Sequence, residues 1–263
     1  MTAQLDRFIC FGDSLTELSW GESGLGASLA FLYQRKLDVL NRGLSGYNSD
    51  WSLHCLRQWL EPTSASPSGP KTQLMTIWLG ANDAVLPGEP QHVPLARYEA
   101  NLRAIVALAR ERVPEAGLVL ITPTPYYPES WLDERVRRGL PRTHDRAPER
   151  TREYANAVKR LGEELGVPVA DAHTPVWQEM QRLGPEKEGS LFTDGLHLTS
   201  EAYRYVVDAV KKAIETHYPE KTWDALPLLF PQWREIPNGA LGPNFATADK
   251  AVAAAAAART DPF

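Results

Sequence analysis

Cysteine is scarce in this chain of 263 residues, which contains only Cys10 and Cys55. Two cysteines cannot form the disulfide framework that holds many small secreted proteins together. Long hydrophobic runs are also missing, since no uninterrupted stretch approaches the roughly 18 apolar residues that a transmembrane helix needs. The N-terminus places Asp6 and Arg7 before a very short apolar run, unlike the layout of a signal peptide. We therefore expect a soluble, cytoplasmic protein without integral membrane contact.

A tract rich in lysine and arginine is absent as well. The 33 acidic residues outnumber the 28 basic ones and give a net charge of −5. This balance lacks the positive patch that binds nucleic acid or an anionic membrane surface. Hydrophobic residues make up 43% of the chain, which suffices for a large core and excludes bulk disorder. The expected partner is a small neutral molecule, with no nucleic acid.

Short apolar runs that end in glycine, proline or polar residues alternate with segments of helical periodicity. Length and flanking residues predict buried strands at 8–11, 37–41, 74–79, 117–122 and 167–170. Apolar residues recur every three or four positions, as in amphipathic helices, at 51–60, 95–113, 150–165 and 200–214. Strands that alternate with helices are joined by right-handed crossovers, which build a mostly parallel sheet covered on both faces. The fold class is therefore α/β.

Three segments fall outside this alternation. Residues 126–150 are polar, contain prolines and are too long for a tight connection, so they form a functional loop, a short helical excursion or a solvated insertion. Residues 223–233 are aromatic and aliphatic enough to pack on the body, and one interpretation is a homodimer contact. Residues 236–263 are rich in alanine and lack an apolar stripe, which predicts a flexible tail or marginal helix after a domain of residues 1–235.

Several polar residues and glycines follow the predicted strands, at the edge where open α/β sheets bind ligands. Ser14 follows the first strand, Gly46 the second and Asn82 the third, while Asp194 and His197 stand three residues apart before the last helix. A serine hydroxyl becomes a good nucleophile when a histidine takes its proton and a carboxylate holds the other ring nitrogen. The backbone N–H groups of Ser14 and Gly46 and the Asn82 amide are candidate donors to an oxyanion.

The order of four short sequence blocks resembles that of the SGNH, or GDSL, hydrolases. These blocks are FGDSLT, NRGLSGYNSDW, GAND and DGLHLT. The surrounding sequence, over roughly the first 235 residues, resembles in particular the isoamyl acetate-hydrolysing esterase branch of that superfamily. The resemblance implies a flavodoxin-like, three-layer α/β/α sandwich with a five-stranded parallel sheet. It also implies that no metal or organic cofactor takes part.

The resemblance assigns a role to each candidate site residue. Ser14 would be the nucleophile, Asp194 the acid and His197 the base, while Ser14, Gly46 and Asn82 would form the oxyanion hole. Taken singly, these residues have simpler interpretations as a helix cap, turn glycines or a surface histidine. Their joint occurrence in family order favours catalysis.

The expected activity is that of a serine carboxylester hydrolase, which cleaves small acetyl esters such as isoamyl acetate through an acyl-enzyme. Two alternatives on the same fold are a sugar deacetylase and a lysophospholipase. A third, from another class, is a catalytically idle α/β module that binds a partner.

Overall fold

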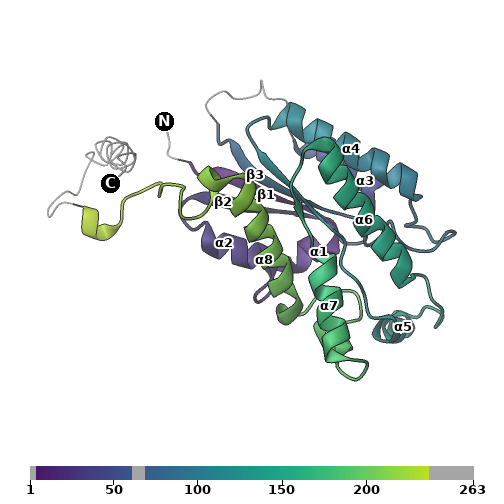
Figure 1. Cartoon of the computed structure of the whole chain (residues 1–263). Coiled ribbons are helices and arrows are strands. Elements are labelled where there is room, and N and C mark those ends of the chain that lie inside the picture. Colours follow the sequence, from purple (N-terminus) through teal and green to yellow (C-terminus); the bar gives the residue numbers. More distant parts are fainter. Residues whose placement is uncertain (1–3, 61–68, 237–263) are drawn as a thin grey trace.

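A computed structural model describes residues 4–60 and 69–236 of the chain. Apart from Ile236, the predicted alanine-rich tail lies outside the described residues, so the domain boundary at 235 stays a prediction. Figure 1 shows a central sheet with helices on both faces. Within the described residues, every helix is too short or too polar to span a bilayer.

Five parallel strands form the sheet, in the order β2-β1-β3-β4-β5. They are β1 (Asp6–Gly12), β2 (Leu37–Gly43), β3 (Thr72–Trp78), β4 (Gly117–Ile121) and β5 (Val169–Ala170). Each coincides with a predicted strand, within a few residues at either end. The last strand is the shortest, because Pro168 has no N–H to donate to a neighbouring strand.

The helices cover both faces of the sheet, so the predicted three-layer α/β/α sandwich is confirmed (Figure 1). One face carries α3 (Ser49–Trp59), α4 (Leu95–Arg112) and α6 (Pro148–Leu165). The other carries α2 (Leu25–Leu32), α7 (His173–Leu183) and α8 (Ser200–His217). Side chains of a strand point alternately to the two faces, so Phe8 and Cys10 of β1 enter one hydrophobic cluster and Ile9 and Phe11 the other.

Two of these helices, α2 and α7, lie outside the predicted helical ranges. The α2 sequence, LGASLAFL, is apolar almost throughout and therefore gives no amphipathic period. In α7, Pro175 stands in the first turn, where proline is tolerated although it resembles a helix breaker in the sequence.

Several short elements complete the fold. They are the helices α1 (Ser14–Glu17) and α5 (Pro128–Arg137) and four 3₁₀ turns, η1 (Leu18–Trp20), η2 (Glu188–Leu191), η3 (Pro219–Lys221) and η4 (Trp233–Glu235). The α5 helix lies within the 126–150 segment, which is therefore a short helical excursion rather than an extended loop.

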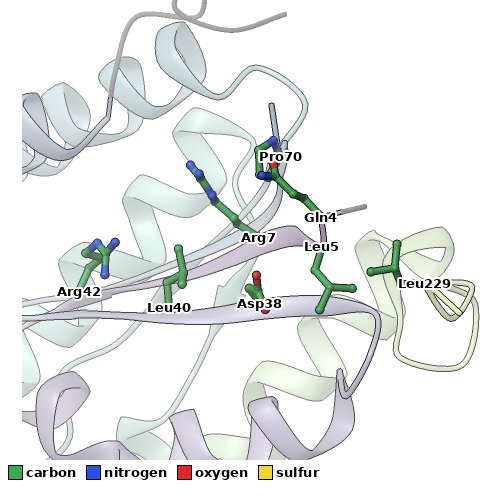
Figure 2. Close-up of a pocket in the computed structure, with 8 residues that line it drawn as sticks. All are labelled: Gln4, Leu5, Arg7, Asp38, Leu40, Arg42, Pro70 and Leu229. Carbon is green, nitrogen blue, oxygen red and sulfur yellow. The ribbon is translucent and has the colours of Figure 1, made fainter. Parts of the chain in front are cut away.

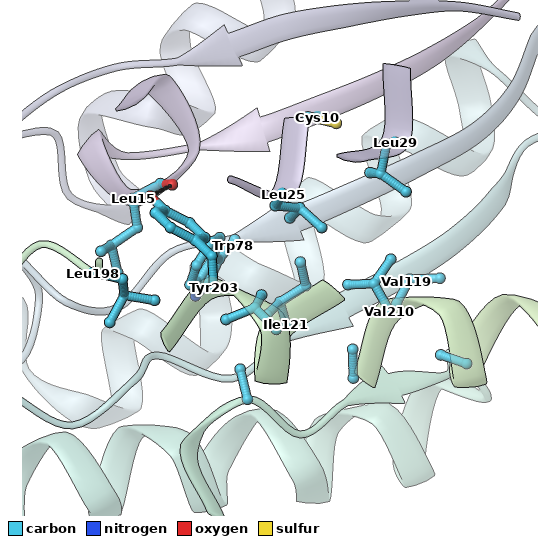
Figure 3. Close-up of a cluster of buried hydrophobic side chains, with 14 of the residues drawn as sticks. Cys10, Leu15, Leu25, Leu29, Trp78, Val119, Ile121, Leu198, Tyr203 and Val210 are labelled. Carbon is cyan, nitrogen blue, oxygen red and sulfur yellow. Dashed lines mark hydrogen bonds between the residues drawn. The ribbon is translucent and has the colours of Figure 1, made fainter. Parts of the chain in front are cut away.

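The hydrophobic cluster under α8 ties this helix to the turn that follows β1 (Figure 3). The Tyr203 hydroxyl of α8 donates to the carbonyl oxygen of Leu15 at 2.7 Å. The Tyr203 ring also meets the edge of Trp78 from β3, with 6.3 Å between ring centroids. Because Leu15 directly follows Ser14, these contacts fix the backbone that carries the candidate nucleophile.

The segment after α8 returns to the turn between α2 and β2. Arg35 donates from Nη2 to the carbonyl oxygens of Phe230 and Pro231, at 2.6 and 2.8 Å. Trp233 nevertheless remains 74% exposed. The homodimer contact expected over residues 223–233 stays a prediction.

Candidate active site

The loops that carry the candidate residues meet at one edge of the sheet. Strands β1, β2 and β3 are adjacent and parallel, so the residues that follow Gly12, Gly43 and Trp78 lie at the same edge. The loop after β2 is held to the end of β1 by a hydrogen bond from Leu44 N to Gly12 O at 3.0 Å. Parallel topology thus gathers chain segments that are far apart in sequence.

Ser14 is the first residue of α1, and Asp13 caps that helix. The Asp13 carboxylate accepts a hydrogen bond from Leu15 N at 2.9 Å, which satisfies a backbone donor of the first turn. Asp13, rather than Ser14, is therefore the residue that caps this helix. The Ser14 hydroxyl is left for another partner.

That partner is His197, which links Ser14 to Asp194. His197 Nε2 lies 2.8 Å from Ser14 Oγ, and His197 Nδ1 lies 2.7 Å from Asp194 Oδ2. When the proton of a neutral imidazole is on Nδ1, it donates to Asp194 while Nε2 accepts the Ser14 hydroxyl hydrogen. Two hydrogen bonds in series thus join a carboxylate, an imidazole and a hydroxyl.

Asp194 is held by its own turn as well as by the imidazole. Its Oδ1 accepts from the backbone N–H groups of Leu196 and His197, at 2.9 and 2.8 Å. Burial alone would raise the pKa of Asp194, but hydrogen bonds from the His197 ring and these N–H groups outweigh burial and lower the pKa to about 2. The carboxylate therefore stays ionised throughout the neutral range.

Gly195 gives this turn its shape. Its φ of +93° lies in the region that side chains disfavour. The glycine also packs against the start of α5, and Tyr127 N donates to Gly195 O at 2.6 Å. The turn that carries Asp194 and His197 therefore rests directly on the 126–150 segment.

The candidate oxyanion residues lie in two loops that contact each other. Gly46 has a φ of +80°, and its carbonyl oxygen accepts from Gln91 Nε2 at 2.6 Å. Asn82 is buried and donates from Nδ2 to the carbonyl oxygen of Tyr47 at 2.9 Å. An amide nitrogen carries two hydrogens, so this bond leaves one for a ligand.

Two further buried carboxyls flank these residues, Asp13 and Asp83. Burial raises the pKa of each to about 7, although hydrogen bonds from Leu15 N to Asp13 and from Ser49 to Asp83 oppose that change. In each carboxyl, Oδ2 is buried without a hydrogen-bond partner among the described residues. Neither carboxyl is recognisable as buried from the sequence, because aspartates of this kind look like surface carboxylates until burial is known.

A run of arginines at the end of α5 and directly after it occupies different environments. Arg135 is buried, with Nη1 at 2.6 Å from Asp145 Oδ2. Arg137 is exposed, whereas Arg138 reaches the active site, with Nη2 at 3.4 Å from Asp194 Oδ2. The run is therefore only partly a solvated face.

A surface hollow of about 640 Å³ lies away from these residues (Figure 2). Arg7, Asp38, Leu40 and Leu229 are among the residues that line it, and it runs along the edge strand β2. Across residues 4–60 and 69–236, no three or more histidine, cysteine or acidic side chains are grouped to hold a metal ion.

Comparison with known proteins identifies the family. The model of the GDSL-like Lipase/Acylhydrolase family matches residues 10–205. The isoamyl acetate-hydrolyzing esterase 1 homolog of Bos taurus is 38% identical over 233 residues, which cover 88% of each chain. The isoamyl acetate-hydrolyzing esterase of Saccharomyces cerevisiae is 33% identical over 243 residues, which cover 88% of this chain and 95% of that protein.

Solved structures show the same fold. A lipase/acylhydrolase from Enterococcus faecalis superposes with a TM-score of 0.54 at 22% identity, covering 81% of this chain and 96% of that one. An acetylxylan esterase from Geobacillus stearothermophilus does so with a TM-score of 0.55 at 23% identity and the same coverage. Since the family match spans most of the chain and the sequence relatives align over nearly their full lengths, this protein belongs to the GDSL-like lipase and acylhydrolase family and is a carboxylic ester hydrolase.

Proposed function

We propose that this esterase hydrolyses small neutral esters, acetyl esters above all, through an acyl-enzyme on Ser14. His197 is the general base and Asp194 the carboxylate that orients it. Ser14 N–H, Gly46 N–H and the Asn82 amide bind the oxyanion. The observation that carries the proposal is the pair of hydrogen bonds that joins Asp194, His197 and Ser14 in series, at 2.7 and 2.8 Å.

In the first half of the reaction, Ser14 Oγ attacks the ester carbonyl carbon while its proton passes to His197 Nε2. The carbonyl electron pair moves to oxygen, and the three donors stabilise the resulting oxyanion. Asp194 stabilises the imidazolium that forms. When the tetrahedral intermediate collapses, the C–O bond to the alcohol breaks and His197 returns its proton to the departing alkoxide oxygen.

In the second half, water takes the place of the alcohol. His197 Nε2 removes a proton from the water as its oxygen attacks the acyl carbon of the Ser14 ester. The second tetrahedral intermediate collapses with the acyl carbon–Oγ bond breaking, and the imidazolium protonates Oγ. The products are a carboxylic acid and the enzyme in its starting protonation state.

The acetyl preference rests on the relatives. Those named isoamyl acetate-hydrolyzing esterases are similar to this chain over nearly its whole described length. Sugar deacetylation and lysophospholipid hydrolysis follow the same steps, so the substrate's acyl and alcohol parts distinguish these activities. Membership in an esterase family argues against a catalytically idle binding module.

The test is a substrate series with wild type and the variant Ser14→Ala. We expect kcat/KM to fall from p-nitrophenyl acetate to butyrate to octanoate, with isoamyl acetate cleaved by wild type alone. A preference for octanoate would favour a lipid hydrolase. Cleavage of a peracetylated sugar at a rate far above that of isoamyl acetate would favour a deacetylase.

A further inference from the structure

We infer that the buried guanidinium of Arg146 is a positioning residue, which orients the Asn82 amide by holding the peptide bond that precedes it. Arg146 lies in the connection between α5 and α6, far in sequence from the other site residues. The inference rests on the proposed role of Asn82 in the oxyanion hole.

The contact is short and shielded from water. Arg146 Nη1 donates to the carbonyl oxygen of Ala81 at 2.5 Å, and the two residues are 6% and 5% exposed. That carbonyl belongs to the same planar peptide unit as the backbone nitrogen of Asn82. A rotation of this unit would therefore move the Asn82 side chain relative to Ser14.

The residue before Arg146 holds the other end of the same loop. The carbonyl oxygen of Asp145 accepts from Leu86 N at 2.7 Å. Two consecutive residues of the 126–150 segment thus bind residues 81 and 86, the two ends of the loop that carries Asn82. The start of the same segment contacts Gly195 on the other side of the site.

Packing fixes the direction of the guanidinium. It lies over the ring of Trp131, with 4.9 Å from Cζ to the ring centroid. Trp131 Nε1 donates to Asp145 Oδ1 at 2.7 Å, and Asp145 Oδ2 pairs with Arg135 at 2.6 Å. All of these side chains are buried, so the arginine has little freedom to turn away from Ala81.

The arrangement is poorly explained as a device for stability alone. The Arg146 side chain is buried, its nearest carboxylate contact runs from Nε to Asp145 Oδ1 at 4.0 Å, and its Nε has no hydrogen-bond partner in the described part of the chain. A buried cation without a close, fully bonded counter-ion costs free energy. Its place against the Ala81 carbonyl therefore fits a role in holding the Asn82 loop better than a role in stability.

A double-mutant cycle tests the inference with p-nitrophenyl acetate as substrate. The four proteins are wild type, Arg146→Gln, Asn82→Ala and the double variant, each checked for folding by circular dichroism. Removal of one oxyanion donor costs about 10²–10³-fold in kcat. We therefore expect Asn82→Ala to lie in that range and Arg146→Gln to lose roughly tenfold or more, with KM little changed.

The coupling decides the outcome. When Arg146 acts through Asn82, the double variant has a kcat within about threefold of Asn82→Ala. Losses that multiply overturn the inference, because Arg146 would then act elsewhere. If Asn82→Ala turned over at the wild-type rate, the proposed role of Asn82 would be refuted, and this inference with it. That result differs from the case in which Asn82→Ala is slow and the two losses multiply, which overturns only the inference about Arg146.

A conservative variant separates positioning from stability. Arg146→Lys keeps the charge but loses the planar fork, and should recover part of the lost kcat. If Arg146→Gln does not fold, the same cycle is run with Arg146→Lys. A double variant as slow as Asn82→Ala then supports the inference, and losses that multiply overturn it.

Discussion

The contact between Gly195 and α5 predicts that Gly195→Ala impairs both stability and catalysis. A Cβ at this position would meet Trp131 N, Tyr127 O at 2.7 Å and Ser130 C at 2.9 Å. These atoms are backbone, so they cannot turn away as the end of a flexible side chain would. The methyl group must instead push the start of α5 and the turn of Asp194 and His197 apart.

The cost has two parts. A side chain in the left-handed region costs roughly 1–2 kcal/mol, and overpacking of a closed site costs about 1–3 kcal/mol. The variant should therefore lose about 2–5 kcal/mol of unfolding free energy. At this chain length each kcal/mol lowers the midpoint of thermal unfolding by roughly 2–4 °C.

Gly88→Ala is the matched control. Gly88 has a φ of +97°, close to the +93° of Gly195, but an added Cβ would meet nothing within 4 Å. This variant should lose only the backbone part, about 1–2 kcal/mol, and keep the wild-type kcat. Thermal unfolding and p-nitrophenyl acetate hydrolysis measured on both variants isolate the contact. Equal midpoints for the two variants, with wild-type kcat in Gly195→Ala, would refute the reasoning.

Four further predictions follow from the site and the fold. Asp194→Asn should lower kcat by about 10³–10⁴-fold, because an amide can hold His197 in the wrong tautomer; a loss under tenfold would contradict this role. His197→Ala should lower kcat by about 10³-fold or more because it removes the base, so a folded variant with close to the wild-type rate would exclude His197 from that role. Because burial raises the pKa of Asp83 from 3.8 to about 7, its contribution to stability is present at low pH and lost as the pH rises through that interval. The unfolding midpoint of wild type should therefore fall relative to that of Asp83→Asn between pH 4 and 7. If the midpoints of the two proteins changed in parallel with pH, this prediction would be contradicted. Light scattering should show a dimer that deletion of residues 223–263 converts to a monomer, whereas monomers of both proteins would end the dimer interpretation.

Much of the architecture follows from local sequence. Apolar runs such as LMTIWL end at glycine or proline, and such runs give the inner strands β3 and β4, which are buried on both faces of the parallel sheet. The edge strand β2 is also present as predicted, although most of its residues are only half-buried. The helix α2 was missed, since an almost wholly apolar segment shows no period. The sequence left open whether residues 126–150 form a loop, a short helix or a solvated insertion, and packing decides between these. Pro128 starts α5, and Trp131 anchors this helix under the active site.

Part of the candidate site likewise follows from the sequence, and part depends on the packing of the folded chain. Ser14, Gly46 and Asn82 each follow a strand, so parallel topology already predicts that their loops gather at one edge. The contact of Arg146 with Ala81 joins residues 65 positions apart through a side chain. No periodicity or motif announces such a contact, because it depends on the route of an irregular segment. The distances between Ser14, His197 and Asp194 likewise require coordinates.

The central claim is that Ser14 carries the acyl group, and acid-quenched mass spectrometry tests it most directly. Wild-type enzyme mixed with p-nitrophenyl acetate should yield an acetylated peptide that contains Ser14. Ser14→Ala should yield none and lose about 10³-fold or more in kcat. Folded Ser14→Ala that cleaves acetate at close to the wild-type rate, or an acetyl group found only on another residue, would contradict the proposed mechanism.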